Sequence, residues 1–176
     1  YVLVHGAWMG AWAWDDVAKD LRGRGHAVTV VELPAHGQDQ TPVAGATLDA
    51  YTQAALSAID AALAPVVLVG HSMGGVVISS AAEARPARVQ RLVYVAAYLP
   101  KDGQSLLNLA MTDAGSKAGP AIKQNADGTL GLPQVSLGDI FCADCGAAAL
   151  ARLTSRYRDE PAAPFLTAVK LSAAAF

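Results

Sequence analysis

The residues Gly70–Gly74 read G-H-S-M-G and match the pattern G-x-S-x-G, in which a serine stands between two glycines. A serine hydroxyl becomes a nucleophile when a base takes its proton and a sharp turn presents its oxygen away from backbone groups. Flanking glycines let the chain bend tightly and let a following helix approach the preceding strand. The pattern predicts that Ser72 is the nucleophile of an acyl transfer. The alternative is a serine in a tight glycine turn without catalysis.

An acyl-transfer nucleophile requires hydrogen-bond donors for the negative oxygen that develops on the attacked carbonyl group. A helix is predicted directly after Ser72. The first N–H groups of this helix, and the positive end of its dipole, point toward the developing negative oxygen. The Met73 N–H is therefore one predicted donor. The Ala7 N–H is the second, because Ala7 follows the H-G pair that ends another predicted strand. The alternative for His5 and Gly6 is an ordinary turn.

Alternating strands and helices are predicted to position these residues. Short β-branched apolar runs predict buried strands, and apolar residues at spacings of three and four predict helices. The predicted strands are 1–5, 27–33, 66–69 and 91–97. The predicted helices between them are 15–22, 48–64 and 76–84. This alternation indicates an α/β fold with a mostly parallel sheet flanked by helices.

The alternation stops near residue 100. Residues 101–133 are rich in Gly, Ala, Asn and Asp without a clear period, and 144–158 resume a helical pattern. Because about four strands are visible, we expect the sheet to lack its last strands. The expected units are the N-terminal part of the core at 1–100, an inserted cap at 101–161, and a return toward the core at 162–176, as a short helix or the lead-in to a further strand.

The composition excludes several classes of protein. The 176 residues are 53% hydrophobic and 16% charged, with a formal net charge of -2. The basic residues are spread along the chain, so no nucleic acid partner is expected. Apolar runs are far shorter than the roughly 18 residues of a membrane helix, so no membrane partner is expected. We expect a soluble protein, cytoplasmic by default, that takes a small-molecule partner and no metal or other cofactor.

Weaker signals have two interpretations each. The pattern C-x-x-C at Cys142 and Cys145 is found in redox and zinc sites, but no second pair or histidine cluster accompanies it. Reduced packing residues are therefore the preferred interpretation. Residues near the predicted site or in the predicted cap are expected to line a substrate pocket, with core packing as the alternative. These pocket residues are Gly6, Trp8, His71, Leu137 and Phe141.

Five stretches together resemble the α/β-hydrolase superfamily. They read V-L-V-H-G-A-W-M-G-A-W at Val2–Trp12, G-H-A-V at Gly25–Val28, L-P-A-H-G at Leu33–Gly37, V-G-H-S-M-G-G at Val69–Gly75 and A-A-Y-L-P at Ala96–Pro100. Within the superfamily they are similar to the esterase branch that includes plant methylesterases, salicylate-binding esterases and hydroxynitrile lyases. The resemblance runs through the first hundred residues and is thinner beyond them. It implies a serine carboxylesterase that hydrolyses small, largely apolar esters through an acyl-enzyme on Ser72.

The superfamily places its triad in the chain order nucleophile, acid, histidine. All four histidines of this sequence precede Ser72: His5, His26, His36 and His71. No triad histidine or acid is therefore assigned within residues 1–176. We expect the base and the acid to come from other residues or a second chain.

Two alternatives to the esterase stay open. The resemblance implies a hydroxynitrile lyase as one of them, and lyases of this branch place a threonine directly after the first-strand histidine. Gly6 stands there in this sequence, which favours the esterase. The second alternative is a non-catalytic binding protein that keeps the pocket without a complete triad. An open edge of the sheet would also favour pairing with a second copy, as a homo-oligomer.

Overall fold

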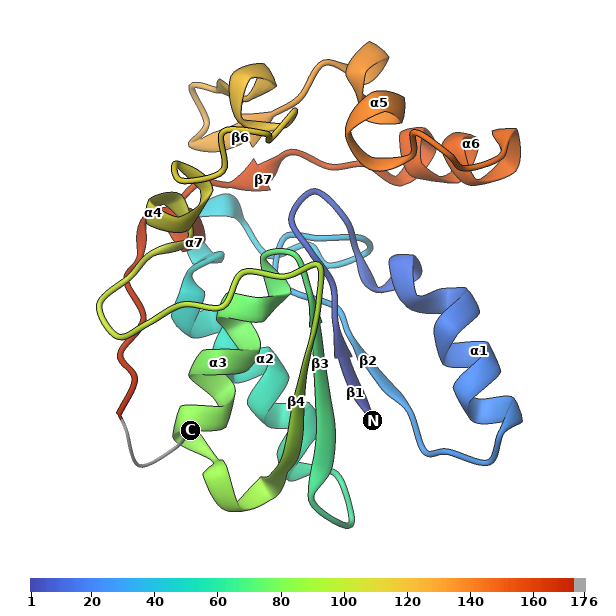
Figure 1. The fold of residues 1–176 in the computed structure, drawn as a ribbon, viewed down its shortest axis with the longest axis vertical. Coiled ribbons are helices and arrows are strands. Elements are labelled where there is room, and N and C mark those ends of the chain that lie inside the picture. Colours follow the sequence, from blue (N-terminus) through green and yellow to red (C-terminus); the bar gives the residue numbers. More distant parts are fainter. Residues whose placement is uncertain (173–176) are drawn as a thin grey trace.

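The computed structural model describes residues 1–172. Its main sheet has four parallel strands in the order β2-β1-β3-β4 (Figure 1). The strands are β1 (Val2–Val4), β2 (Thr29–Val31), β3 (Val66–His71) and β4 (Val89–Val95). The predicted strands are all present, and the prediction of an α/β fold with a parallel sheet is confirmed.

Helices cover both faces of this sheet. They are α1 (Asp15–Gly23), α2 (Leu48–Asp60) and α3 (Gly74–Ala84). Helices α2 and α3 lie together on one face, and α1 lies on the other (Figure 1). Helix α2 begins where the sequence predicts, because the Thr47 hydroxyl accepts the Ala50 N–H at 3.1 Å as an N-cap.

Side chains of the central strands alternate between the two faces, as the pleat of a strand requires. In β1, Val2 and Val4 belong to the larger buried cluster, which includes residues of α2 and α3. Leu3 belongs to a second cluster with Trp14 and Ala18 on the side of α1. Both faces of β1 are buried, which explains its continuous apolar sequence. Packing on both faces therefore holds β1 in place, including its carboxyl end.

Residues 101–161 lie across the carboxyl ends of the strands (Figure 1). Their elements are α4 (Leu106–Ala110), β5 (Lys123–Gln124), β6 (Thr129–Gly131), α5 (Leu137–Phe141), α6 (Ala147–Arg156) and β7 (Glu160–Pro161). Residues 101–133 show no clear period in the sequence, yet they contain β5 and β6, which form an antiparallel sheet with β7. Strands of two or three residues are too short to show a period. The D-G pair at Asp127 and Gly128, with Gly128 at φ 84°, was the hairpin signal.

Residues near the start of this segment pair with residues that follow it. Ser105 and Ala168 form an antiparallel bridge, and the Val169 N–H donates to the Gln104 carbonyl at 2.9 Å. The predicted short helix after residue 162 is α7 (Ala163–Leu166). The last residues of that prediction, 173–176, lie outside the described part of the chain. No helix within residues 1–172 is long and apolar enough to cross a membrane.

Cys142 and Cys145 form a disulfide that joins the end of α5 to the turn before α6. The expectation of two reduced cysteines is wrong. The chain turns after α5, with the Cys145 N–H donating to the Cys142 carbonyl at 3.2 Å. This turn brings the two Cα atoms to 5.0 Å, a separation that a disulfide spans.

Candidate active site

The carboxyl ends of β1 and β3 meet where the strand order changes direction, since β2 lies on one side of β1 and β3 lies on the other. Open parallel sheets bind ligands in the crevice outside such a point. The loop after β1 carries Ala7, and the turn after β3 carries Ser72. Both residues line one cavity of about 100 Å³. The fold therefore brings together residues that are 65 positions apart in the sequence.

Ser72 lies at a strained turn between β3 and α3. Its φ of 53° is in the left-handed region, where serine is uncommon. The Ser72 carbonyl accepts N–H groups from Gly75 at 3.0 Å and Tyr98 at 3.1 Å, and these bonds hold the turn. Such strain costs about 1–3 kcal/mol and persists only where the surrounding structure imposes it. Strand, turn and helix follow one another as a nucleophile elbow requires.

Close backbone packing explains the glycines around this turn. A Cβ at Gly70 would lie 2.5 Å from the Gly74 carbonyl oxygen, and a Cβ at Gly74 would lie 2.7 Å from the Val4 carbonyl oxygen. The start of α3 therefore touches β1 directly. A Cβ at Gly6 would lie 2.9 Å from the Ser72 Cβ. The three glycines let the loop after β1 and the serine turn approach each other.

Two buried backbone donors lie beside Ser72. Ala7 and Met73 line the same cavity and are 4% and 1% exposed. Neither backbone N–H has a hydrogen-bond partner within residues 1–172. Buried N–H groups are rarely left without a partner, so this cavity offers two donors to a ligand.

The remaining walls of the cavity are largely apolar. Of the predicted pocket residues, Trp8 and Phe141 line it, and their ring centroids are 5.8 Å apart. Leu137 does not line it, because this side chain is fully buried in the main core. The further lining residues are Tyr98, Leu106, Ala110, Ser116, Ala118, Gly119, Ile122 and Phe165.

His71 does not line the Ser72 cavity either, because neighbouring residues on the elbow project in different directions. It lines a separate cavity of about 300 Å³ and makes an edge-on contact with Trp14, with ring centroids 6.4 Å apart. Burial lowers the pKa of His71. Gly6, also predicted to line the pocket, lines neither cavity, although a Cβ there would lie 2.9 Å from the Ser72 Cβ and 3.0 Å from the His71 Nδ1.

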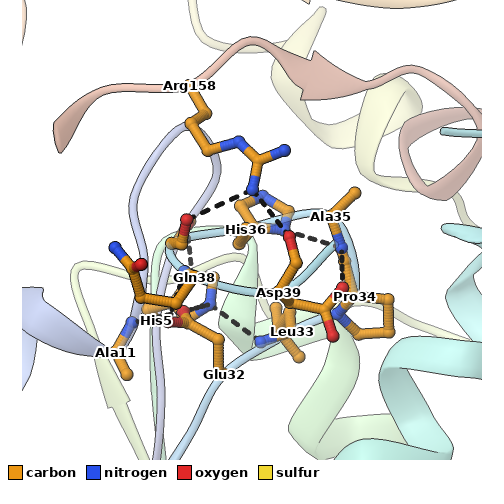
Figure 2. Close-up of polar contacts among 12 residues, drawn as sticks. His5, Ala11, Glu32, Leu33, Pro34, Ala35, His36, Gln38, Asp39 and Arg158 are labelled. Atoms are coloured by element: carbon orange, nitrogen blue, oxygen red, sulfur yellow. Dashed lines mark hydrogen bonds and ion pairs between the residues drawn. The ribbon is translucent and has the colours of Figure 1, made fainter. Parts of the chain in front are cut away.

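His5 is fully buried and uses both ring nitrogens within the fold (Figure 2). Its Nδ1–H donates to the Gly6 carbonyl at 2.9 Å, and its Nε2 accepts the Leu33 N–H at 3.1 Å. Burial, with the nearby positive charge of His36, lowers the pKa of His5 to about 3. The Glu32 carboxylate lies 3.6 Å from Nε2, but it forms no ion pair with a neutral ring. His5 is therefore a structural histidine.

His36 is held in the opposite protonation state. Its Nδ1 lies 3.0 Å from the Pro34 carbonyl, and its Nε2 lies 2.7 Å from the Glu160 carboxylate. Both neighbours are acceptors, so both ring nitrogens must carry a proton. Burial lowers the pKa of His36, but the Glu160 charge and these hydrogen bonds outweigh it, and the net pKa is raised. These contacts and the raised pKa favour the imidazolium form of His36.

Glu160 was not predicted from the sequence. This first residue of β7 is fully buried, and its carboxylate accepts three hydrogen bonds. The donors are the His36 ring at 2.7 Å, the Trp8 backbone N–H at 2.9 Å and the Tyr51 hydroxyl at 3.1 Å. The neighbouring Arg158 guanidinium also reaches the loop after β2 and donates to the Asp39 carbonyl at 2.8 Å (Figure 2). A pairing across 124 residues leaves no local pattern that could have revealed it.

A parallel sheet with helices on both faces and a serine at a strand–turn–helix junction defines an α/β-hydrolase fold. A family model described as "Alpha/beta hydrolase family" matches residues 1–175, and the chain belongs to this family. The resemblance inferred from the sequence motifs is confirmed.

The relatives of this chain include esterases and a hydroxynitrile lyase. The chain is 40% identical over 112 residues to a carbendazim hydrolyzing esterase of Nocardioides sp. (strain SG-4G), covering 62% of this chain and 46% of that protein. It is 41% identical over 103 residues to an alpha-hydroxynitrile lyase of Arabidopsis thaliana, covering 57% of this chain and 40% of that protein. The alignments thus span less than half the length of these relatives.

Solved structures share the fold over nearly the whole chain. An extracellular α/β-hydrolase from a Paenibacillus species is 29% identical, with a TM-score of 0.80 over 97% of this chain and 70% of that one. A pyrethroid hydrolase from Sphingobium faniae JZ-2 is similar in fold, with a TM-score of 0.87 and 24% identity over 99% of this chain and 72% of that one.

Proposed function

We propose that this chain carries the nucleophile and the oxyanion hole of a serine carboxylesterase. The Ser72 oxygen attacks the ester carbonyl carbon while a base takes the hydroxyl proton, and the Ala7 and Met73 N–H groups stabilise the negative oxygen. The alcohol then leaves with a proton, and water releases the acid from the acyl-enzyme. The observation that carries this proposal is the strained Ser72 beside two buried N–H groups without partners.

The base and its orienting acid are proposed to lie outside residues 1–176. No histidine follows Ser72, and the histidines before it are poorly suited to the task. His5 uses both ring nitrogens in the fold, His36 pairs with Glu160, and His71 faces a different cavity. The short span of the chain against its curated relatives supports this part of the proposal.

The cavity supports a small, largely apolar ester as the substrate. A volume of about 100 Å³ accepts one small group, and most of the side chains around it are apolar. Relatives named methylesterase 7 of Arabidopsis thaliana and methyl jasmonate esterase 1 of Vitis vinifera point to the same substrate class. The segment 101–161 acts in this proposal as the cap that covers the ester.

A hydroxynitrile lyase is the second candidate, favoured by the 41% identity to the lyase of Arabidopsis thaliana. The position after the first-strand histidine argues against it. A Cβ at Gly6 would lie 2.9 Å from the Ser72 Cβ and 3.0 Å from the His71 Nδ1, so a threonine side chain does not fit there without a shift. Release of cyanide from mandelonitrile without hydrolysis of any ester would favour the lyase.

The proposal is tested by labelling with a fluorophosphonate, in which the Ser72 oxygen bonds to phosphorus and fluoride leaves. The protein is purified, its intact mass is measured, and the label is mapped to a peptide. In a protein that also supplies the proposed base from outside residues 1–176, we expect the label on Ser72 and hydrolysis of short-chain aryl esters. Ser72→Ala should abolish both, whereas Ser80→Ala, on the same helix, should keep both. Absence of labelling and turnover in the wild-type protein would contradict the proposal and favour a binding-only protein.

A further inference from the structure

Trp8 is the residue next to the proposed oxyanion donor, and it is strained. Its φ is 61°, in the left-handed region that a bulky side chain rarely adopts. Such a conformation persists only where the surroundings hold it. The contacts that hold Trp8 come from outside its own loop.

Three residues of the β6–β7 region hold Trp8, and we call them the Trp8 clamp. The Glu160 carboxylate accepts the Trp8 backbone N–H at 2.9 Å. The Leu130 carbonyl accepts the indole Nε1–H at 2.7 Å, and the Arg158 N–H donates to the Trp8 carbonyl at 3.4 Å. Both backbone polar groups and the side chain of Trp8 are therefore bound by the segment 101–161.

Glu160 is the member of the clamp best placed to act on the chemistry. Its hydrogen bond fixes the peptide plane between Ala7 and Trp8, and the pairing of β1 with β3 holds the chain up to Val4, three residues before Ala7. The carboxylate itself is fixed by the Tyr51 hydroxyl and the His36 imidazolium. A charged, buried acceptor gives a stronger hydrogen bond than a neutral one.

We infer that Glu160 is a positioning residue for the oxyanion hole, which acts through the Trp8 N–H and keeps the Ala7 N–H aimed at the Ser72 cavity. This inference rests on the proposed esterase function and deepens it. Glu160 touches neither Ser72 nor its cavity, so it is not a catalytic residue. The arrangement makes the oxyanion hole depend on β7 being docked, because the loop after β1 has no comparable anchor for Trp8 within residues 1–172.

The experiment compares fluorophosphonate labelling rates and ester kinetics of four variants with the wild-type protein. Glu160→Leu removes the acceptor. The second variant carries the α-hydroxy analogue of tryptophan at position 8, which replaces the backbone N–H by an ester oxygen and leaves Glu160 in place. It tests the same hydrogen bond if Glu160→Leu does not fold. Glu160→Gln keeps an oxygen toward Trp8 when its NH₂ donates to the Tyr51 oxygen. Tyr51→Phe is the matched control, because it removes a hydrogen bond to Glu160 and leaves Trp8 bound.

We expect labelling and kcat to fall about tenfold or more in the first two variants with KM unchanged, since loss of a whole oxyanion donor costs about 10²–10³ in kcat. Glu160→Gln and Tyr51→Phe should label at about the wild-type rate even if they melt at lower temperature. Wild-type rates in a folded Glu160→Leu or in the ester variant would overturn the inference alone. An unlabelled and inactive wild-type protein would overturn it together with the proposed function.

Discussion

Two buried histidines in one cluster have opposite protonation states. The rings of His5 and His36 lie 4.9 Å apart between centroids, and both are fully buried. His5 faces one donor and one acceptor, so its ring is neutral, whereas His36 faces two acceptors, so its ring is charged. Burial lowers the pKa of both rings, and the Glu160 carboxylate beside His36 offsets this effect for that ring alone. The neutral state of His5 avoids two like charges side by side.

The low pKa of His5 predicts weaker stability in acid. Its pKa is about 3 in the folded protein against 6.5 for an ordinary histidine, so the unfolded chain binds one more proton between these values. The free energy of unfolding should therefore fall by about 1.4 kcal/mol per pH unit as pH drops below about 6. Urea unfolding between pH 4 and 7 measures this slope.

His5→Gln, which keeps a donor and an acceptor, should lose this part of the slope. His26→Gln, at an exposed loop histidine, is the control and should keep it. Equal slopes in His5→Gln and the wild-type protein would contradict the assignment of a neutral His5. The raised pKa of His36 acts in the opposite direction, because its contribution is complete below pH 6.5 and is lost as pH rises through its folded pKa.

At the scale of elements, the site depends on contact between β1, β3 and the start of α3. The Gly74 backbone lies so close to the Val4 carbonyl that a Cβ has no room. This approach brings the loop after β1 and the turn after β3 within reach of one substrate group. The parallel register of β1 and β3 places Val4 opposite Gly70, and it thereby fixes how the loop after β1 and the turn after β3 are aligned along the strand direction.

Gly70→Ala tests how tightly this contact is packed. The new Cβ would lie 2.5 Å from the Gly74 carbonyl oxygen, so we expect a loss of about 1–3 kcal/mol in the free energy of unfolding. Gly23→Ala, at the end of α1, meets nothing within 4 Å and should be neutral or stabilising by about 0.4–1 kcal/mol. Urea denaturation measures both. Equal stability of the two variants would show that the elbow tolerates a side chain.

Which elements the sequence predicts depends on how far each pattern extends. The strands of the main sheet are covered on both faces and appear in the sequence as apolar runs. The helices between them appear as apolar residues at spacings of three and four. The turn at Ser72 is local, so its residues predict its form. β5, β6 and β7 are too short to show a pattern. Glu160 depends on Trp8, Tyr51 and His36, and these long-range pairings carry no sequence signature without related sequences to compare.

At the scale of the molecule, the segment 101–161 contacts the core at several places, among them the Trp8 clamp and the Arg152–Asp16 ion pair. Within it, the disulfide closes the turn that follows Phe141. Phe141 lines the Ser72 cavity and contacts the Trp8 ring, so the disulfide lies one residue from the proposed substrate wall. A disulfide stabilises chiefly by restricting the unfolded chain.

The double substitution of Cys142→Ser with Cys145→Ser should lower the free energy of unfolding by about 2 kcal/mol, the loop-closure value for so short a loop. A reductant should lower the melting temperature of the wild-type protein toward that of the variant. The variant itself should not respond to reductant, which separates the disulfide from other effects. A wild-type melting temperature that is insensitive to complete reduction would contradict the structural role.

The buried imidazolium of His36 also offers a means of observing the molecule. Its two N–H protons are donated to fixed acceptors away from water, so they should exchange slowly and give separate downfield lines in a proton NMR spectrum. One of these acceptors, Glu160, belongs to β7, so that line persists only while β7 is docked. This line would thus report, without any added label, whether the segment above the candidate active site is docked on the core.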